Sequence, residues 1–198
     1  MTSPLLLRRR LCAVPLMALA GCGSSPPVQL YRLHGEPPAG ATLPTPAPGA
    51  DAVQLLLPVR LPDYLDREAI LLPQGTSGLL ALSGHRWAES LRDAVPRVLQ
   101  QDLAAHLGEG RVWTAPLPPA LVPARQLRVE FGAFEVDTDR SGVRLDARWT
   151  WIDAQGRTPP RALSARLRVP AGGASIDALV DAHRLALWQL AARIAAAR

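Results

Sequence analysis

Three segments in the second half of the chain alternate apolar and polar residues with a period of two, the pattern of half-buried β-strands. Their apolar positions are Leu127, Val129 and Phe131, then Val143, Leu145, Ala147, Trp149 and Trp151, then Leu163, Ala165, Leu167 and Val169. Short polar stretches that end in glycine, at residues 139–142 and 153–156, separate the segments, so the pattern predicts three successive antiparallel strands. In the first of them the apolar phase slips between Ala133 and Phe134, beside Gly132, which indicates a β-bulge.

Two other segments, Trp87–Leu107 and Ile176–Ile194, repeat apolar residues every three or four positions, as amphipathic helices do. The apolar stripe of the first is Leu91, Val95, Val98, Leu99, Leu103 and Leu107, and that of the second is Ile176, Leu179, Leu187, Leu190 and Ile194. Pro96 lies inside the first helix and is expected to kink or split it near residues 92–96, because proline has no backbone N–H. Ser175 is expected to cap the second helix.

Shorter strands are expected before the first helix. Val53–Leu61 is expected to be a buried strand, and Ile70–Leu72 and Leu79–Leu82 are expected to lie on either side of a turn at residues 74–78. Together these elements predict an α+β fold in which two amphipathic helices pack on one face of a mixed, mainly antiparallel sheet. Residues 53–198 have the length of a single domain.

The opposite face of this sheet is expected to be rich in charge. Its residues are Arg128, Glu130, Arg144, Asp146, Arg148, Arg166 and Arg168. One interpretation is a solvated face with cross-strand ion pairs, each contributing about 0.2 to 1 kcal/mol. The other is a surface that meets lipid phosphates or an acidic partner.

The N-terminus has the layout of a secretory signal peptide, with Arg8–Arg10 before a short apolar run that Pro15 interrupts. This run is too short to span a bilayer. Leu19–Cys22 resembles the lipobox of bacterial lipoproteins, which implies that residues 1–21 are removed and that Cys22 is lipidated; the alternative is an ordinary signal peptide with a chance cysteine. Gly23 stands where lipoproteins of the inner membrane typically have Asp, which implies the periplasmic face of the outer membrane. The arginines only partly match a twin-arginine signal, so the export route stays open.

Residues 22–52 are expected to connect the anchor to the domain. Val28–Leu33 is expected to be a short first strand, followed by a proline-rich loop over residues 35–50. If this strand belongs to the domain, the domain lies within roughly 20 Å of the membrane, the extended length of about six residues. In the alternative, the stretch to Ala50 is a flexible tether and the domain begins at Val53.

Composition narrows the classes of function. Loss of the three signal-peptide arginines leaves 19 arginines against 17 carboxylates, so little excess charge remains for binding nucleic acid. Cys12 leaves with the signal peptide and Cys22 is lipidated, so no free thiol is expected, and the chain contains no lysine for phosphate-loop or Schiff-base chemistry. His34, His85, His106 and His183 show no metal-ligand spacing, and no serine lies in a nucleophile-elbow motif. We expect neither catalysis nor a metal or other cofactor.

Two segments resemble a known family. Leu61–Ile70, with its Tyr-Leu-Asp-Arg core, and Arg86–Leu91, which contains Arg-Trp-Ala-Glu, are similar to the ABC-type transport auxiliary lipoproteins, the PqiC-like family. Tyr31 and Leu33, soon after the lipobox, fit as well. The resemblance covers most of the mature chain. Two positions depart from the family pattern: Ser90 stands in place of an expected proline, and the segment 71–73 replaces the usual polar continuation.

This resemblance implies a non-enzymatic, outer-membrane-anchored subunit of an MCE-type system that moves lipids between the two membranes. The implied partner is an MCE-domain protein, and phospholipid binding and homo-oligomer formation stay open. The implied contact surface contains Tyr64, Asp66, Arg67, Arg86 and Trp87. In a structural alternative, Tyr64 and Trp87 fill the core while Asp66 and Arg67 pair within a turn. A scaffold or assembly lipoprotein of another envelope complex is the alternative function, and an exported enzyme is a third.

Overall fold

The computed structural model describes residues 27–42, 45 and 51–198. The signal peptide, Cys22 and most of residues 43–50 therefore lie outside the described residues. In chain order the elements are β1 (Gln29–Tyr31), β2 (Val53–Leu55), the 3-10 helix η1 (Asp63–Leu65), β3 (Ala69–Gln74), β4 (Gly78–Trp87), α1 (Leu91–Leu107), β5 (Val112–Trp113), β6 (Arg125–Val136), β7 (Gly142–Asp153), β8 (Arg161–Pro170) and α2 (Ile176–Ala196).

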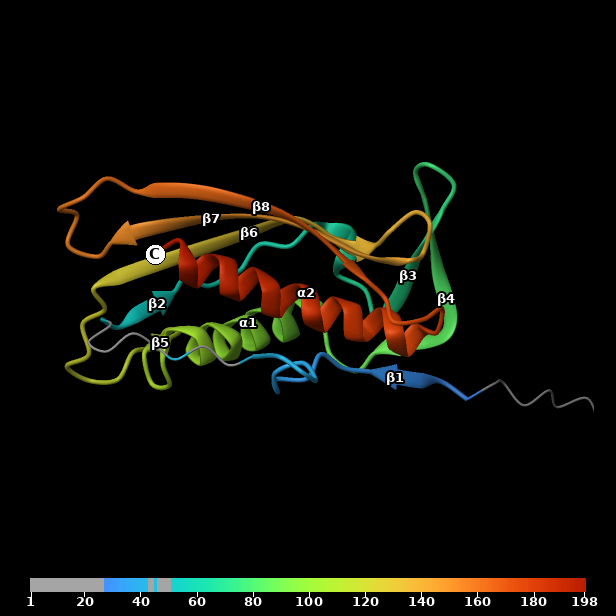
Figure 1. Cartoon of the computed structure of the whole chain (residues 1–198), viewed down its shortest axis with the longest axis horizontal. Helices are drawn as coiled ribbons and strands as arrows, with labels where there is room; N and C mark the ends of the chain where they lie inside the picture. Colours follow the sequence, from blue (N-terminus) through green and yellow to red (C-terminus); the bar gives the residue numbers. More distant parts are fainter. Residues whose placement is uncertain (1–26, 43–44, 46–50) are drawn as a thin grey trace, which may run out of the picture.

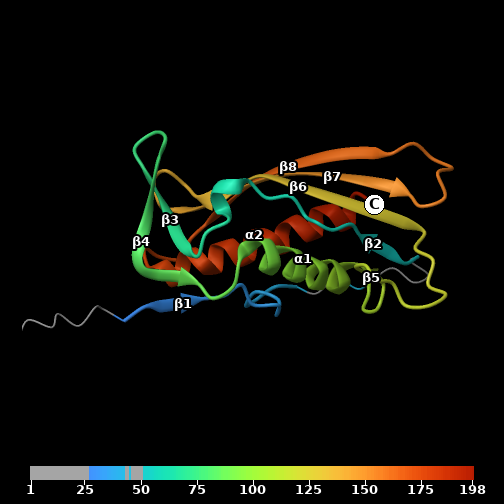
Figure 2. The same cartoon turned by 180° about the vertical axis from the view of Figure 1, so that it is seen from behind.

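The strands form two sheets (Figures 1 and 2). The larger has the order β5-β2-β6-β7-β8, in which β6, β7 and β8 are antiparallel neighbours and β2 is parallel to β5 and β6. The smaller has the order β1-β4-β3, with β3 and β4 antiparallel and β1 parallel to β4. The α+β class and the mainly antiparallel pairing are confirmed. The expected mixed sheet is divided in two because the end of β4 pairs with β1 instead of with the long strands.

The long strands were predicted well because each has one buried and one solvated face. Leu127 and Val129 of β6 and Leu145 of β7 are fully buried, and their polar neighbours in sequence face outward. The register shifts between Phe131 and Ala133, so the expected bulge is present at Gly132. The bulge allows two consecutive residues, Ala133 and Phe134, to be buried.

Some boundaries differ from the expected ones. Trp87, expected to open the first helix, ends β4, and the helix begins only after Ser90, whose hydroxyl accepts a hydrogen bond from the N–H of Arg92 at 3.1 Å. Ser90 is thus the N-cap of α1. The expected split at Pro96 is wrong, because α1 runs continuously through it. A proline near the start of a helix removes a single hydrogen bond of the helical ladder.

The chain before residue 69 is less regular than expected. Only Val53–Leu55 of the expected 53–61 strand is regular, followed by an isolated bridge between Arg60 and Glu130. β5 was not expected, since two residues are too few to show a period. Gln29–Tyr31 pairs with β4, and Leu33 just after it is buried in the core.

Both helices lie on the inner side of the larger sheet (Figures 1 and 2). α2 packs against β6, β7 and β8, and α1 packs against α2 and β5. One continuous apolar core joins these layers, and Leu99 of α1, Leu187 of α2 and Leu145 of β7 are its fully buried members. In the described part of the chain, neither helix is long and apolar enough to cross a membrane.

A buried ion pair links the two helices. The guanidinium of Arg184 (α2) donates to both carboxylate oxygens of Asp102 (α1), at 2.6 and 2.8 Å, and their side chains are 6% and 1% exposed. Arg184 also donates two hydrogen bonds, at 2.7 and 3.1 Å, to the backbone carbonyl of Glu36. Burial is the largest influence on Asp102 and raises the pKa of its carboxyl to about 6, against the opposing effect of Arg184. The pair therefore joins α1, α2 and the loop after β1.

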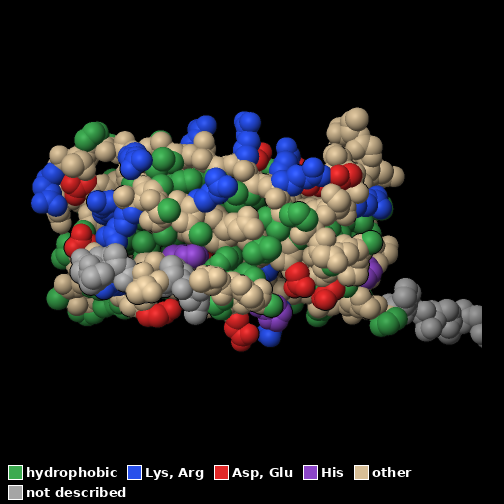
Figure 3. Space-filling view, viewed as in Figure 1, with side chains coloured by type: hydrophobic (Ala, Val, Ile, Leu, Met, Phe, Trp, Pro, Cys, Tyr) green, Lys and Arg blue, Asp and Glu red, His purple; other side chains and the backbone are tan. Residues whose placement is uncertain are grey.

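The outer face of the larger sheet is charged, as expected, and carries ion pairs. Arg168 contacts Asp137 and Asp139 at 2.5 and 2.6 Å, Arg144 contacts Glu135, and Arg60 lies 3.7 Å from Glu130. The side chains of three exposed arginines on this face, Arg128, Arg148 and Arg166, have no hydrogen bond or ion pair to other described residues. Figure 3 shows the basic side chains spaced along this edge of the molecule. The ion-pair interpretation therefore holds for part of the face.

Candidate partner-binding surface

The residues that the sequence singled out gather where η1, the end of β4 and the start of α1 meet. Asp66, Arg67 and Arg86 are exposed, Tyr64 is half-buried, and Trp87 is buried. We call the exposed charged residues around η1 the η1 surface; they are Asp63, Asp66, Arg67, Glu68, Arg86 and Arg92.

Ion pairs order most of the η1 surface. Arg92, in the first turn of α1, lies 2.9 Å from Asp63 and 3.0 Å from Asp66, and so holds η1 against the helix. Arg86 of β4 lies 3.3 Å from Glu68. Arg67 makes no hydrogen bond or ion pair with another described side chain. The alternative in which Asp66 pairs with Arg67 inside the turn is therefore wrong, and Arg67 presents an uncompensated positive charge to solvent.

Tyr64 is fixed from the other side by the larger sheet. Its hydroxyl donates a 2.6 Å hydrogen bond to Glu135 of β6, and Glu135 also contacts Arg144 of β7. Partial burial, followed by the hydrogen bond and the charge of Glu135, raises the pKa of Tyr64 well above its usual value of 10. The phenol is therefore a neutral donor at any physiological pH, and it ties η1 to the larger sheet.

An open groove lies beside this hydrogen bond. It has a volume of about 450 Å³ and lies between the β3–β4 hairpin and the end of β6 with the start of β7. Tyr64, Leu79, Val136 and Arg144 are among its lining residues. Sequence analysis missed Glu135 and this groove. The bulge at Gly132 was the available signal, because the phase slip it causes decides the face on which Glu135 lies.

Trp87 belongs to the core and not to an accessible surface. It is 7% exposed and packs edge-on against His183 of α2, with ring centroids 5.6 Å apart. The structural alternative is therefore correct for Trp87. His183 also contacts Phe134, with ring centroids 4.8 Å apart, and its Nδ1 lies 2.7 Å from the carbonyl oxygen of Leu179. Complete burial is the main cause that lowers the pKa of His183 to about 4.

His183 should make the stability of the protein depend on pH. The unfolded imidazole takes up a proton near its ordinary pKa of 6.5, whereas the folded one does so only near 4. The stabilisation is therefore complete above pH 6.5 and is lost as pH falls toward 4, by about 3 kcal/mol in total. We expect the difference in unfolding free energy between wild type and His183→Phe, measured in urea from pH 4 to 8, to shrink by this amount as pH falls.

The prediction concerns the difference in unfolding free energy between wild type and His183→Phe, and not the stability of wild type alone. The reason is that Asp102 changes the stability with pH in the opposite direction. Its raised pKa makes the folded state bind a proton more readily, so its stabilisation is present below its ordinary value of 3.8 and is lost as pH rises through about 6. Asp102 is common to both proteins and its contribution cancels. A difference that stays constant from pH 4 to 8 would show that His183 does not titrate as described.

Potential metal ligands are dispersed over the described part of the chain. Among the described residues no three His, Cys, Asp or Glu side chains gather as metal ligands. His85 contacts the hydroxyl of Tyr31 at 2.9 Å, His106 packs against Trp188, and His183 lies in the core, so these three histidines occupy separate places. The η1 surface offers a rigid set of charged groups at which a protein partner could pair.

Comparison with known proteins agrees with the resemblance seen in the sequence. A family model described as "ABC-type transport auxiliary lipoprotein component" matches residues 31–195. Among solved structures, an uncharacterized protein superposes with a TM-score of 0.68 at 17% identity, covering 87% of this chain and 99% of its own. A DUF330 protein from Xanthomonas campestris gives a TM-score of 0.62 at 14% identity, covering 85% of this chain and 93% of its own. No curated protein sequence matches. At these identities the two structures support the fold alone, and the family match identifies the chain as a member of the ABC-type transport auxiliary lipoprotein component family.

Proposed function

We propose that this lipoprotein is a non-catalytic accessory subunit of an MCE-type lipid transport system, held by acylated Cys22 at the periplasmic face of the outer membrane. The family match over residues 31–195 carries the proposal, because it describes an auxiliary transport component. In this proposal another subunit supplies the energy, and this protein positions an MCE-domain partner.

The η1 surface is the proposed contact. It lies beside the end of the fold at which the chain enters, since β1 pairs with His85–Trp87 of β4 and Arg86 lies opposite Leu30 in that pairing. Its side chains are held in place by Arg92 and by the Tyr64–Glu135 hydrogen bond, which lowers the entropy cost of binding. Arg67 is the residue most open to pairing with a partner's carboxylate.

Reversing the charge of Arg67 should weaken this contact without affecting the fold. We expect Arg67→Glu to reduce recovery of the MCE-domain protein by at least about ten-fold, the effect of losing one central arginine contact. The measurement is affinity capture of the full-length lipoprotein from mildly crosslinked envelopes of its own host, with partners quantified by mass spectrometry.

Arg148→Glu is the matched control, because Arg148 is also exposed and unpaired but lies on the outer face of the larger sheet. Arg148→Glu should leave recovery of the MCE-domain protein within about two-fold of wild type, because a charge outside the contact has only a small effect on binding. Recovery of other envelope proteins with no MCE-domain protein would contradict the transport proposal and favour the scaffold function. Equal losses in the two variants would contradict the η1 surface alone.

A further inference from the structure

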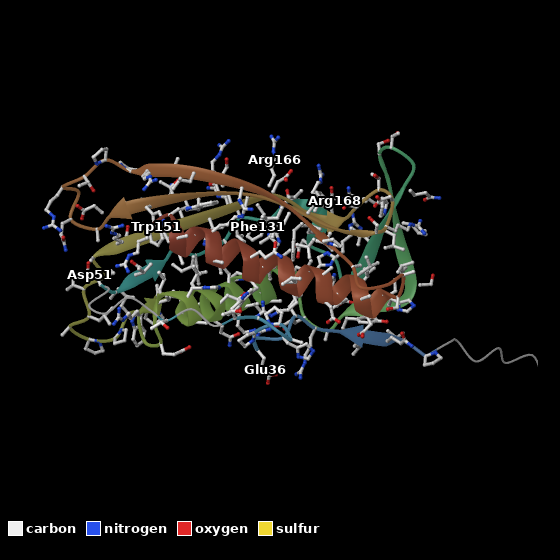
Figure 4. All side chains as sticks on the ribbon, in the orientation of Figure 1. Glu36, Asp51, Phe131, Trp151, Arg166 and Arg168 are labelled. Carbon is white, nitrogen blue, oxygen red and sulfur yellow. The ribbon has the colours of Figure 1, made fainter. Side chains whose placement is uncertain are left out.

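An open cavity of about 730 Å³ lies at the end of the larger sheet away from β1. The start of β6, the end of β7, the β7–β8 turn and the last residue of the chain form its walls. Asp51 and Trp151, two of its lining residues, are labelled at this end in Figure 4. We call this cavity the arginine pocket, after the side chains described next.

Four arginines line the arginine pocket, and they come from four separate places in the chain. They are Arg125, Arg157, Arg161 and Arg198. Among the described side chains that line it, two are carboxylates, those of Asp51 and Asp153. Figure 3 shows basic side chains gathered at this end of the molecule. The lining therefore carries a net positive charge, which low-dielectric walls concentrate within the cavity.

The two carboxylates are poor partners for these arginines. Asp153 accepts hydrogen bonds from the backbone N–H groups of Gln155 and Arg157, at 3.0 and 3.1 Å, and Arg157 reaches it only at 3.6 Å. The carboxylate of Asp51 lies 3.9 Å from Arg198, whose guanidinium donates a 3.1 Å hydrogen bond to the backbone carbonyl of Asp51. Asp153 is thus occupied by its own turn and the Asp51 carboxylate makes one long contact, so neither neutralises the cluster.

The remaining cations have little or no compensation. The side chain of Arg125 makes no hydrogen bond or ion pair with other described residues, and the side chain of Arg161 makes one 3.4 Å hydrogen bond to the carbonyl of Ala197. Burial, followed by repulsion from Arg125, lowers the pKa of Arg198. Residues 43–50, which precede Asp51 in the sequence, contain no carboxylate.

The pocket also offers features that suit a peptide. Ile152, Pro159 and Pro160 give it apolar walls. Trp151 lines it as well. A ligand with carboxylates and small apolar side chains would complement both the arginines and these apolar walls.

The position of the pocket favours a protein ligand over a lipid. β1, at which the chain leaves toward its N-terminal anchor, lies at one end of the long axis and the pocket lies at the other (Figure 1). A membrane that holds the N-terminus faces the β1 end, so the pocket is directed away from it. A protein segment approaching from the opposite side meets the pocket first.

We propose that the arginine pocket is a docking site for an acidic segment of a protein partner, whose Asp or Glu side chains pair with Arg125, Arg157 and Arg161. This site is separate from the η1 surface. The choice of protein over lipid rests on the N-terminal membrane anchor proposed above, and the site does not depend on the transport function.

The test uses a fluorescein-labelled heptapeptide of alternating glutamate with leucine and proline, and a twin in which every glutamate is glutamine. Binding to the full-length protein, purified in neutral detergent, is followed by fluorescence anisotropy. We expect the acidic peptide alone to bind. We further expect the triple variant Arg125→Gln/Arg157→Gln/Arg161→Gln to weaken binding by at least about ten-fold, the sum of several partly exposed ion pairs.

The matched control is Arg128→Gln/Arg148→Gln/Arg166→Gln, which removes the same charge from exposed, unpaired arginines of the same sheet. It should leave the affinity within about two-fold of wild type, since only net charge changes. Equal losses in both triple variants would overturn the proposal, because binding would then follow net charge. Pocket-dependent binding of dihexanoyl-phosphatidylglycerol in place of the peptide would also overturn it, in favour of a lipid phosphate site.

Discussion

Replacing Arg184 with methionine is expected to lower the free energy of unfolding by about 3 to 5 kcal/mol, because it leaves the carboxylate of Asp102 buried without a charged partner. The carboxylate is 1% exposed and would lose both of its short hydrogen bonds. The carbonyl of Glu36 would lose two donors as well. Urea denaturation at pH 7 measures the loss.

The double variant Asp102→Leu/Arg184→Met separates two contributions to stability: the cost of burying an unpaired charge, and the net stabilisation that the ion pair itself provides. Removing both charges leaves no uncompensated ion, and such replacements are often neutral or stabilising. We therefore expect the double variant to regain most of the stability lost in Arg184→Met. A single variant that loses less than about 1 kcal/mol, the effect of a surface pair, would show that Asp102 does not depend on Arg184.

Truncating Phe134 to alanine is expected to cost about 3 to 5 kcal/mol, the range for a large aromatic side chain removed from a core. Phe134 is fully buried just after the bulge of β6. Its ring lies 5.8 Å from that of Phe131 and 4.8 Å from that of His183, measured between centroids, so the cavity would open where the larger sheet meets α2. The measurement is again the free energy of unfolding in urea.

Val122→Ala is the control for this truncation, because Val122 is 72% exposed and its loss should change stability by less than about 0.5 kcal/mol. A cost for Phe134→Ala as small as that of the control would mean that the sheet and α2 close over the vacated space. Intermediate values would measure how far this part of the core can relax.

Local patterns predicted the long strands and α2 because the cause of each pattern is local. Successive residues of β7 face the helices and the solvent in turn, and the apolar stripe of α2 faces the sheet. The repeat length of apolar residues is therefore enough to identify β7 as a strand and α2 as a helix. Trp87 shows the limit of this reasoning. A buried aromatic residue four residues before the first residue of a helix fits either a strand end or a first turn. The pairing of β4 with β1, more than fifty residues away in sequence, decides between them.

The sites that sequence reasoning missed depend on contacts between residues far apart in the chain. Asp102 and Arg184 are 82 residues apart, and Tyr64 and Glu135 are 71 apart. Each of these residues is unremarkable among its own neighbours in sequence. The arginines of the pocket likewise become a cluster only when the start of β6, the β7–β8 turn and the end of α2 meet.

The parallel pairing of β1 with β4 has a mechanical consequence for a chain held at its N-terminus. Tension applied there acts along β1, so the hydrogen bonds to His85–Trp87 are sheared together and not peeled apart one at a time. After β1, the two hydrogen bonds from Arg184 to the carbonyl of Glu36 connect the chain to the two helices, so the remaining force acts on α1 and α2. If Cys22 is anchored as proposed, we expect β1 and residue 36 to be the successive points at which the domain resists a force that pulls it away from the membrane.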